Sequence, residues 1–320
     1  MTASTAATIT RFRPEDPPGR AVLTRIVFGA ASDGTAIQAD DRREVELLAS
    51  YGQREGYSAD MLYGGFQRGK LVTGTLAVES PGRMALVFIP PGRGMEPHES
   101  MTIRALDILR SEARRRDIVL LQALVDPADR QQANVLAGAG YSKLATLLYC
   151  RRMVHVAPPP AISVRDLEFV TYAEGGDSLF LPAVAATYEG SLDCPGLAGL
   201  RAIEDVVTGH RATGEYDPNL WYAAKSDGET LGVLLLSPVA GRSCFEVVYM
   251  GVVPEHRGCG VGSALLAHAC RVCEEKGIDE LILAVDRENT PARAVYDHWA
   301  FATIAQRDAW IFPLAERGGD

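Results

Sequence analysis

One stretch constrains the fold more than any other: residues 252–262, which read Val-Val-Pro-Glu-His-Arg-Gly-Cys-Gly-Val-Gly. It overlaps the end of an apolar run, Val247–Val253, and precedes a helical pattern over Ser263–Glu275. A strand, a glycine-rich loop and a helix in this order are typical of a phosphate-binding site. Glycines let the backbone approach the anion, and the first N–H groups of the helix point at it. Arg257 opens the loop, where it can add a charge-assisted contact to a phosphate oxygen.

The spacing of the arginine and the glycines inside the loop indicates which kind of phosphate-binding protein this is. Arg257-x-x-Gly260-x-Gly262 has the Arg/Gln-x-x-Gly-x-Gly/Ala pattern of the GNAT superfamily, the acetyl-CoA-dependent N-acetyltransferases. The chain resembles this family over roughly Val164–Pro313 and much more weakly before it. The resemblance implies an α/β fold (α+β, with a mixed and mostly antiparallel splayed sheet flanked by helices). It also implies that acetyl-CoA is held by backbone groups of Met250, Val252, Arg257, Gly258, Gly260, Val261 and Gly262.

Three further residues match the family in order: Glu246, Asn289 and Tyr296. The resemblance implies that Asn289 meets the amides of the coenzyme, Glu246 acts as general base, and Tyr296 protonates the departing thiolate. A base is useful because an alkyl amine with a pKa of ~10.4 is only about 0.04% neutral at pH 7. Structural alternatives are a salt-bridged strand residue for Glu246 and a core-packed helix tyrosine for Tyr296.

The pattern of elements occurs twice. Val125-Asp126 recurs as Val285-Asp286 at an offset of 160 residues, and the same offset relates Tyr141 to Phe301. This predicts two tandem GNAT-like units. Three prolines within residues 157–161 mark the junction, so the predicted domains are 1–156, a linker at 157–163, and 164–320.

The first copy lacks the residues that carry chemistry. At the offset of 160, Asp129 stands opposite Asn289 and Leu136 stands opposite Tyr296, while Pro90–Pro97 has no counterpart of the glycine motif. The first copy is therefore predicted to be a structural or regulatory partner without catalysis.

Composition excludes several classes of function. The net charge of −9 disfavours non-specific nucleic-acid binding, and no apolar run has the ~18 residues of a membrane span. Met1–Thr10 lacks the apolar core of a signal peptide, so a cytoplasmic location is expected. Six cysteines are too few for a disulfide framework, and Cys270 and Cys273 are interpreted as core residues on one helical face. No metal is expected, and the oligomeric state stays open.

Two other classes of protein remain as alternatives. A dinucleotide or S-adenosylmethionine enzyme would use Gly258-x-Gly260-x-Gly262 with Asp286, but its fingerprint needs glycine at Ser263. A non-catalytic acetyl-CoA sensor or scaffold would not need Glu246 or Tyr296.

The acceptor is expected to be a primary amine of a small molecule or peptide. Asp193, in the loop Ser191–Pro195, can bind a cationic acceptor, although organising the backbone is the favoured interpretation. Tandem chains of this length are similar, in architecture alone, to mycothiol synthases, which acetylate a cysteinyl amine.

Overall fold

The structure is a computed structural model that describes residues 7–28, 45–46, 48–50, 56–92, 98–155 and 167–314. Two compact units divide the chain. Unit 1 comprises Met1–Leu144 and Asp308–Asp320, and unit 2 comprises Ala145–Arg307. The predicted linker at 157–163 lies outside the described residues.

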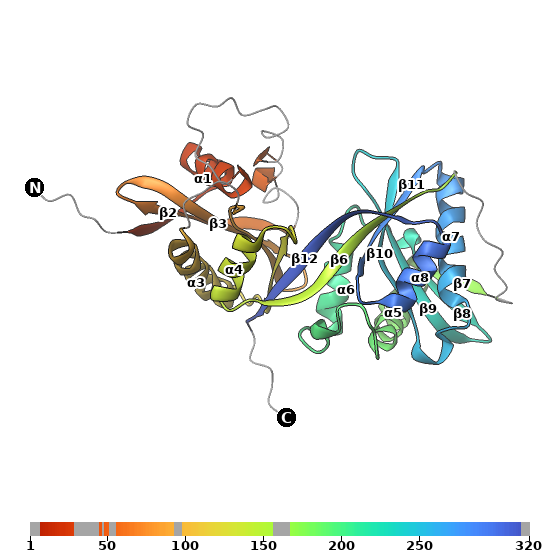
Figure 1. Ribbon diagram of the computed structural model, residues 1–320. Coiled ribbons are helices and arrows are strands. Elements are labelled where there is room, and N and C mark those ends of the chain that lie inside the picture. The colour runs from red at the N-terminus through yellow and green to blue at the C-terminus, as the bar shows by residue number, and fades with distance from the viewer. Residues whose placement is uncertain are drawn as a thin grey trace, which may run out of the picture. The chain divides into compact units, whose positions relative to one another are not determined.

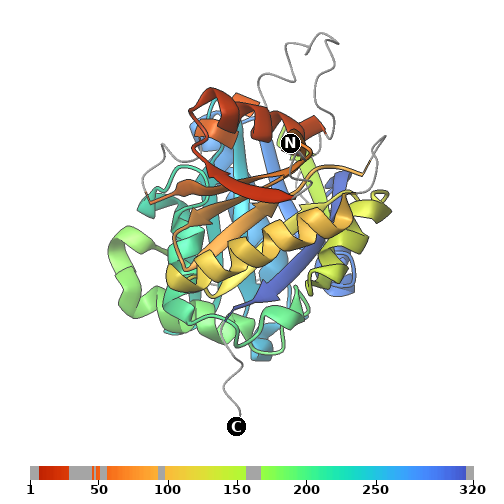
Figure 2. The same ribbon diagram turned by 90° about the vertical axis from the view of Figure 1, so that its left-hand side faces the viewer.

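Unit 1 is a mixed sheet covered on both faces (Figures 1 and 2). Its strand order is β1-β2-β3-β4-β5-β12, antiparallel throughout except for the parallel pair β4–β5. Alternating side chains build two separate cores: Met61 and Tyr63 pack on the side of α3 and α4, and Leu62 and Leu76 pack on the side of α1. The elements are β1 (Thr8–Phe12), α1 (Pro17–Phe28), β2 (Ser58–Gln67), β3 (Lys70–Ser80), β4 (Met84–Phe88), α3 (Glu99–Arg115), β5 (Leu120–Val125) and α4 (Arg130–Gly138).

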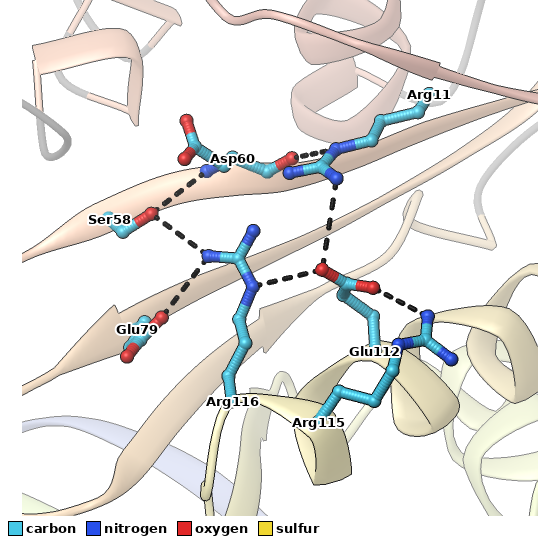
Figure 3. A network of polar contacts seen from close by, with 7 residues as sticks. All are labelled: Arg11, Ser58, Asp60, Glu79, Glu112, Arg115 and Arg116. Atoms are coloured by element: carbon cyan, nitrogen blue, oxygen red, sulfur yellow. Dashed lines mark hydrogen bonds and ion pairs between the residues drawn. The ribbon is translucent and has the colours of Figure 1, made fainter.

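A polar network ties the last turn of α3 to the sheet of unit 1 (Figure 3). The Glu112 carboxylate accepts hydrogen bonds from Arg115 Nη2 at 2.6 Å and Arg116 Nε at 3.1 Å, and Arg11 on β1 lies 3.8 Å away. Arg116 also reaches Glu79 on β3 at 3.3 Å. Hydrogen bonds from Arg115 and Arg116 hold the pKa of Glu112 below its usual value.

Unit 2 repeats this plan. Its strand order is β12-β6-β11-β10-β9-β8-β7, with β10 and β11 parallel. One core lies on the side of α7 and α8 and includes Phe245 and Trp299, and a second core lies under α5 and includes Phe180 and Trp221. The elements are β7 (Glu168–Thr171), α5 (Tyr172–Tyr188), α6 (Ile203–Arg211), β8 (Trp221–Ser226), β9 (Glu229–Pro238), β10 (Cys244–Val252), α7 (Val261–Lys276), β11 (Glu280–Asp286) and α8 (Thr290–His298).

The predicted recurrence appears directly in the elements. Helices α4 and α8 begin at 130 and 290 and end at 138 and 298, an offset of 160 at both ends. Strands β6 (Ser142–Met153) and β12 (Ala302–Pro313) show the same offset. The fold is therefore an α/β fold with two GNAT-like copies, as the sequence predicted.

The compact units do not follow the two sequence copies. Strand β6 ends the first copy, yet its residues Leu147–Met153 pair with β11 of unit 2. Strand β12 ends the second copy, yet Asp308–Pro313 pair with β5 of unit 1. Each unit thus contains the final strand of the other copy, and for this reason the units divide at residues 144 and 307 instead of in the proline-rich segment.

None of the helices in the described ranges has both the length and the apolar character needed to cross a membrane.

Candidate active site

Unit 2 contains a cavity of about 460 Å³ beside the glycine-rich loop. Its walls come from the end of α5 and the loop after it, from β10, from the start of α7, and from β11 and α8. The residues of the sequence-based prediction that line it are Met250, Val252, Arg257, Gly258, Gly260, Gly262, Asn289 and Tyr296. The fold thus brings together most of the predicted site.

The cavity opens where two parallel strands separate. Pairing between β10 and β11 ends at Val247 and Leu283, and β10 has a bulge after Val247. Val252 O accepts a hydrogen bond from Arg257 Nε, so the polar groups of this residue face away from β9. Because these groups alternate along a strand, the N–H groups of Met250 and Val252 both point to the side where β11 has separated. These are two of the residues whose backbone groups are predicted to hold acetyl-CoA.

The glycine-rich loop has the geometry of an anion site. Gly258 and Gly260 have φ angles of +75° and +86°, which favour glycine. Gly260 caps α7, and the first helical bond at this end runs from the Ala264 N–H to Gly260 O. The N–H groups that precede Ala264 lie where a helix has no acceptor of its own, so they are available to an anion. A Cβ atom on Gly262 would meet only Val252 Cγ2, at 4.0 Å, so this edge of the loop has open space.

Arg257 has a different role from the one expected. Its guanidinium donates to four backbone carbonyl oxygens: Val252 O at 3.0 Å, Thr187 O at 3.0 Å, Glu189 O at 2.6 Å and Gly190 O at 3.0 Å. Carbonyl groups at a helix C-terminus lack intrahelical partners, and the planar guanidinium satisfies them at the end of α5. The side chain therefore fixes one wall of the cavity, while its backbone lies at the predicted phosphate loop.

Asn289 caps α8 and holds a neighbouring carboxylate. Its Oδ1 accepts from the Ala292 N–H at 3.3 Å, and its amide donates to Asp193. Asp193 Oδ1 also accepts from the Asp286 N–H at 2.9 Å, and Asp286 Oδ2 accepts from the Cys194 N–H at 3.3 Å. These contacts fasten the loop after α5 to the end of β11.

Tyr296 lies at the inner end of the cavity with 8% of its surface exposed. Its ring packs edge-on against Phe301, with the ring centroids 5.7 Å apart. Burial, together with the negative charge of Asp193, raises the pKa of Tyr296. The phenol therefore stays protonated, as a proton donor requires.

Glu246 lies on β10 but is not among the residues that line the cavity. It precedes the bulge, and its register partners are Ser237 on β9 and Ile282 on β11. Burial raises the pKa of its carboxyl group. The structure thus separates Glu246 from the other predicted site residues.

Four polar side chains near the cavity were missed by the sequence analysis. The Thr187 and Tyr249 hydroxyl groups lie 2.9 Å apart, and the ring of Tyr188 stacks on Tyr249 with centroids 5.0 Å apart. Tyr188 Oη is 3.3 Å from His210 Nε2, and burial lowers the pKa of His210 to about 4. No motif signals these residues, because only the packing of α5 and α6 on β10 brings them together.

Residues 93–97 of the Pro90–Pro97 region lie outside the described residues; in the described part of unit 1, side chains occupy the equivalent position. Asp129, the counterpart of Asn289, accepts from the Gly92 N–H at 2.8 Å and from the Gln132 N–H at 3.0 Å. Gln132 in turn donates to Ile89 O at 2.9 Å. The remaining space is about 40 Å³. Leu136, the counterpart of Tyr296, is fully buried.

Cys270 and Cys273 are free and buried, which confirms their interpretation as core residues. In the part of the chain that the structure describes, no group of three His, Cys, Asp or Glu residues could hold a metal ion.

A splayed sheet, a glycine loop at a helix start and a tyrosine in the same cavity are the features that the resemblance to GNAT acetyltransferases predicts. Residues 191–301 match the acetyltransferase (GNAT) family model. Among relatives, the mycothiol acetyltransferase of Thermomonospora curvata is 27% identical over 230 residues, covering 72% of this chain and 73% of that protein. The one from Beutenbergia cavernae is 35% identical over 101 residues, and the match spans 31% of this chain and only 33% of that protein.

Solved structures show the same architecture. A GCN5-related N-acetyltransferase from Sphaerobacter thermophilus aligns with a TM-score of 0.64 at 18% identity, covering 97% of this chain and 96% of that one. A tandem GNAT protein from the clavulanic acid biosynthesis pathway aligns with a TM-score of 0.52 at 17% identity, covering 97% and 99% of the two chains. Residues 191–301 thus match the GNAT acetyltransferase family, and the chain has the fold of tandem GNAT proteins.

Proposed function

We propose that this protein transfers the acetyl group of acetyl-CoA directly to a primary amine of a small molecule or peptide, with both substrates bound in unit 2. The observation that carries the proposal is the shared cavity. It brings the exposed backbone edge of β10, the start of α7 and Tyr296 to one space of about 460 Å³.

The residues of this cavity fit acetyl-CoA. Backbone N–H groups of Gly258–Gly262 would hold the pyrophosphate, and those of Met250 and Val252 would hold the pantetheine arm and the acetyl carbonyl. A backbone donor aimed at that carbonyl oxygen stabilises the negative charge that develops there, often the largest contribution in acyl transfer. Asn289 contributes by positioning, through its bond to Asp193.

Tyr296 is proposed as the general acid. The thiol of the coenzyme has a pKa of ~8.5, so its thiolate is a moderate leaving group that a neutral phenol can protonate. Glu246 remains the sequence-based prediction for the base, although it does not line the cavity.

The acceptor is proposed as an amine-bearing small molecule because relatives named mycothiol acetyltransferases align over much of the chain. At 27% identity the particular acceptor does not follow from that likeness. Unit 1 is proposed to be non-catalytic, since Asp129 and Gln132 occupy the place of the opening. A cytoplasmic location and the absence of a metal stay predictions.

The test is a panel of primary amines, including cysteinyl amines of amino sugars, assayed for thiol release from acetyl-CoA. Acetylated product with stoichiometric thiol release supports the proposal. Acetyl-CoA binding without transfer to any amine would favour a sensor or scaffold. Stabilisation of the fold by NAD or S-adenosylmethionine but not by acetyl-CoA would indicate the other cofactor class.

A further inference from the structure

Asp193 is a carboxylate in the cavity without a cationic partner. It stands in the loop between α5 and α6, is half-buried, and lines the cavity together with Tyr249 and Tyr296. Its hydrogen bonds come from two neutral donors, the Asp286 N–H and the Asn289 amide. Within the described ranges, no Lys, Arg or His forms an ion pair with it.

The surroundings leave this charge uncompensated. The titratable groups that interact with it directly are all neutral or negative: Asp286 from β11, Tyr296 from α8, Tyr249 from β10, Tyr188 from α5 and Cys194 from its own loop. Two basic residues also line the cavity, but Arg257 donates to backbone carbonyl groups and His256 lies 3.8 Å from Glu229. Burial, which outweighs the two hydrogen bonds, raises the pKa of Asp193. A partly buried carboxylate is costly without a counter-charge, and a bound cation removes that cost.

Two other acidic residues near the site, Asp286 and Glu246, do not line the cavity. Asp286 accepts from the Glu288 N–H at 3.0 Å and from the Cys194 N–H at 3.3 Å, and it is not among the residues that line the cavity. Glu246 also does not line it. Asp193 is thus the acidic side chain that reaches the same space as Tyr296.

We propose that Asp193 binds the ammonium group of the acceptor in the cavity and takes the proton that the nitrogen must lose before it attacks. This inference rests on the proposed acetyltransferase function and names the residue that selects a cationic acceptor. It also explains why Asn289 and Asp286 both donate to this carboxylate: they fix its orientation toward the cavity.

The proton balance is simple. An ammonium group carries one proton too many for attack; Asp193 accepts it, and it passes to solvent. The free amine then forms the new C–N bond while the C–S bond breaks, and the nitrogen loses a second proton. The sulfur gains one proton from Tyr296, and the second proton from the nitrogen then returns Tyr296 to its protonated form. In total, one proton is released to solvent and one ends on the thiol.

The decisive variant is Asp193→Asn, which keeps an oxygen for the Asp286 N–H but removes the charge. We expect kcat/KM for the best amine of the panel to fall by about 10²-fold at pH 7. The variant must rely on free amine, whose fraction rises about tenfold per pH unit below a pKa of ~10.4. The defect should therefore shrink as pH rises. In the wild type, activity should decline on the acid side as Asp193 is protonated, at a higher pH than for an ordinary aspartate.

Asp286→Asn is the matched control, because it alters the same loop attachment without touching the charge in the cavity. It should show no defect that shrinks as pH rises. Because the charge of Asp286 raises the pKa of Asp193, its removal should move the acid limb of the profile to lower pH. Calorimetric affinity for acetyl-CoA should be unchanged in Asp193→Asn, which shows that the fold of the site survives. If Glu246→Gln shows the pH-dependent defect and Asp193→Asn does not, the role belongs to Glu246 and the proposal is overturned.

A binding measurement separates this inference from the proposed function. Benzylamine and its neutral counterpart benzyl alcohol can be titrated by NMR against the protein loaded with CoA. We expect preference for the amine in the wild type, and loss of that preference in Asp193→Asn. This readout remains valid even if no amine of the panel is acetylated. Equal preference in the two proteins would overturn the role of Asp193.

Discussion

The two copies differ at the place that follows the first strand of their parallel pair, β10 in unit 2 and β4 in unit 1. After β10, unit 2 leaves the backbone of a separating strand facing a cavity of about 460 Å³. After β4, unit 1 fills the corresponding place with the side chains of Asp129 and Gln132, and about 40 Å³ remains. One fold therefore has an open cavity in one copy and side chains in the corresponding place of the other.

The two copies differ in which groups form hydrogen bonds with the backbone N–H and C=O groups at this place. In unit 1 the Gly92 N–H and Ile89 O have side-chain partners within the protein. In unit 2 the Met250 and Val252 N–H groups, at the end of the corresponding strand, face the cavity instead. Buried polar groups must be paired, so an N–H group already bonded to a carboxylate is poorly suited to hold the coenzyme. This contrast leads to four predictions.

The largest effect is expected from Gly262→Val. Its Cβ would meet no close atom of the protein, so the fold should survive. The side chain would enter the space proposed for the phosphates. Loss of charge-assisted hydrogen bonds should weaken acetyl-CoA binding by about 10²-fold or more. Calorimetry should give one site per chain in the wild type. Gly262→Ala is the control and should bind nearly normally; a second site per chain would contradict the contrast between units.

Tyr296→Phe should lower kcat by about 10²-fold while acetyl-CoA affinity stays the same, because only the proton donor is removed. Since the pKa of Tyr296 is raised, the donor form persists at alkaline pH, and tyrosine ionisation should not depress wild-type kcat up to pH 10. The matched change in unit 1 is Leu136→Met, which should leave kcat unaltered. If Tyr296→Phe keeps the full kcat under conditions where the chemical step limits the rate, Tyr296 is a packing residue and not the general acid.

Asp129→Ala removes a helix cap and the partner of the Gly92 N–H in unit 1. We expect the free energy of unfolding to fall by about 1–2 kcal/mol, measured by urea denaturation, with kcat unchanged. Asn289→Ala removes the equivalent cap in unit 2 and should lose activity as well, since the Asn289 amide also holds Asp193. Equal activity losses in the two variants would show that unit 1 takes part in the reaction.

The smallest effect is expected from Glu112→Gln in the network of Figure 3. Arg11 and Arg115 have 45% and 68% of their side chains exposed, so solvent screening limits the loss to about 1 kcal/mol or less. Because the folded-state pKa of Glu112 is lowered, its contribution is present above the unfolded pKa of ~4.3 and lost as pH falls through the folded value. The stability difference between variant and wild type should therefore vanish in acid. A difference that persists at pH 2 would mean that Glu112 acts through packing.

Local sequence signals located most elements but not their limits. The apolar pattern of the last strand covers only Ala309–Phe312, because the first half of β12 is largely exposed and shows no apolar alternation. Helix α5 begins at Tyr172 without an apolar pattern in its first turn. The reason is a capping box between Thr171 and Glu174, followed by a kink at Gly176 with a φ of +58°.

The sequence by itself determined the glycine loop and the repeat of 160 residues, because both can be read from residues a few positions apart or at a fixed offset. Only the tertiary structure decided that the final strands of the two copies are exchanged, since pairing partners far apart in the chain leave no local mark. The same holds for Arg257. The sequence predicted that its side chain contacts a phosphate oxygen, and the structure shows it bound to carbonyl groups at the end of α5. It holds for Asp193 too: the sequence shows an acidic residue before a turn, and only packing shows that its charge lacks a partner. Burial and proximity set the energy of a charge, and both depend on elements that the chain brings together from a distance.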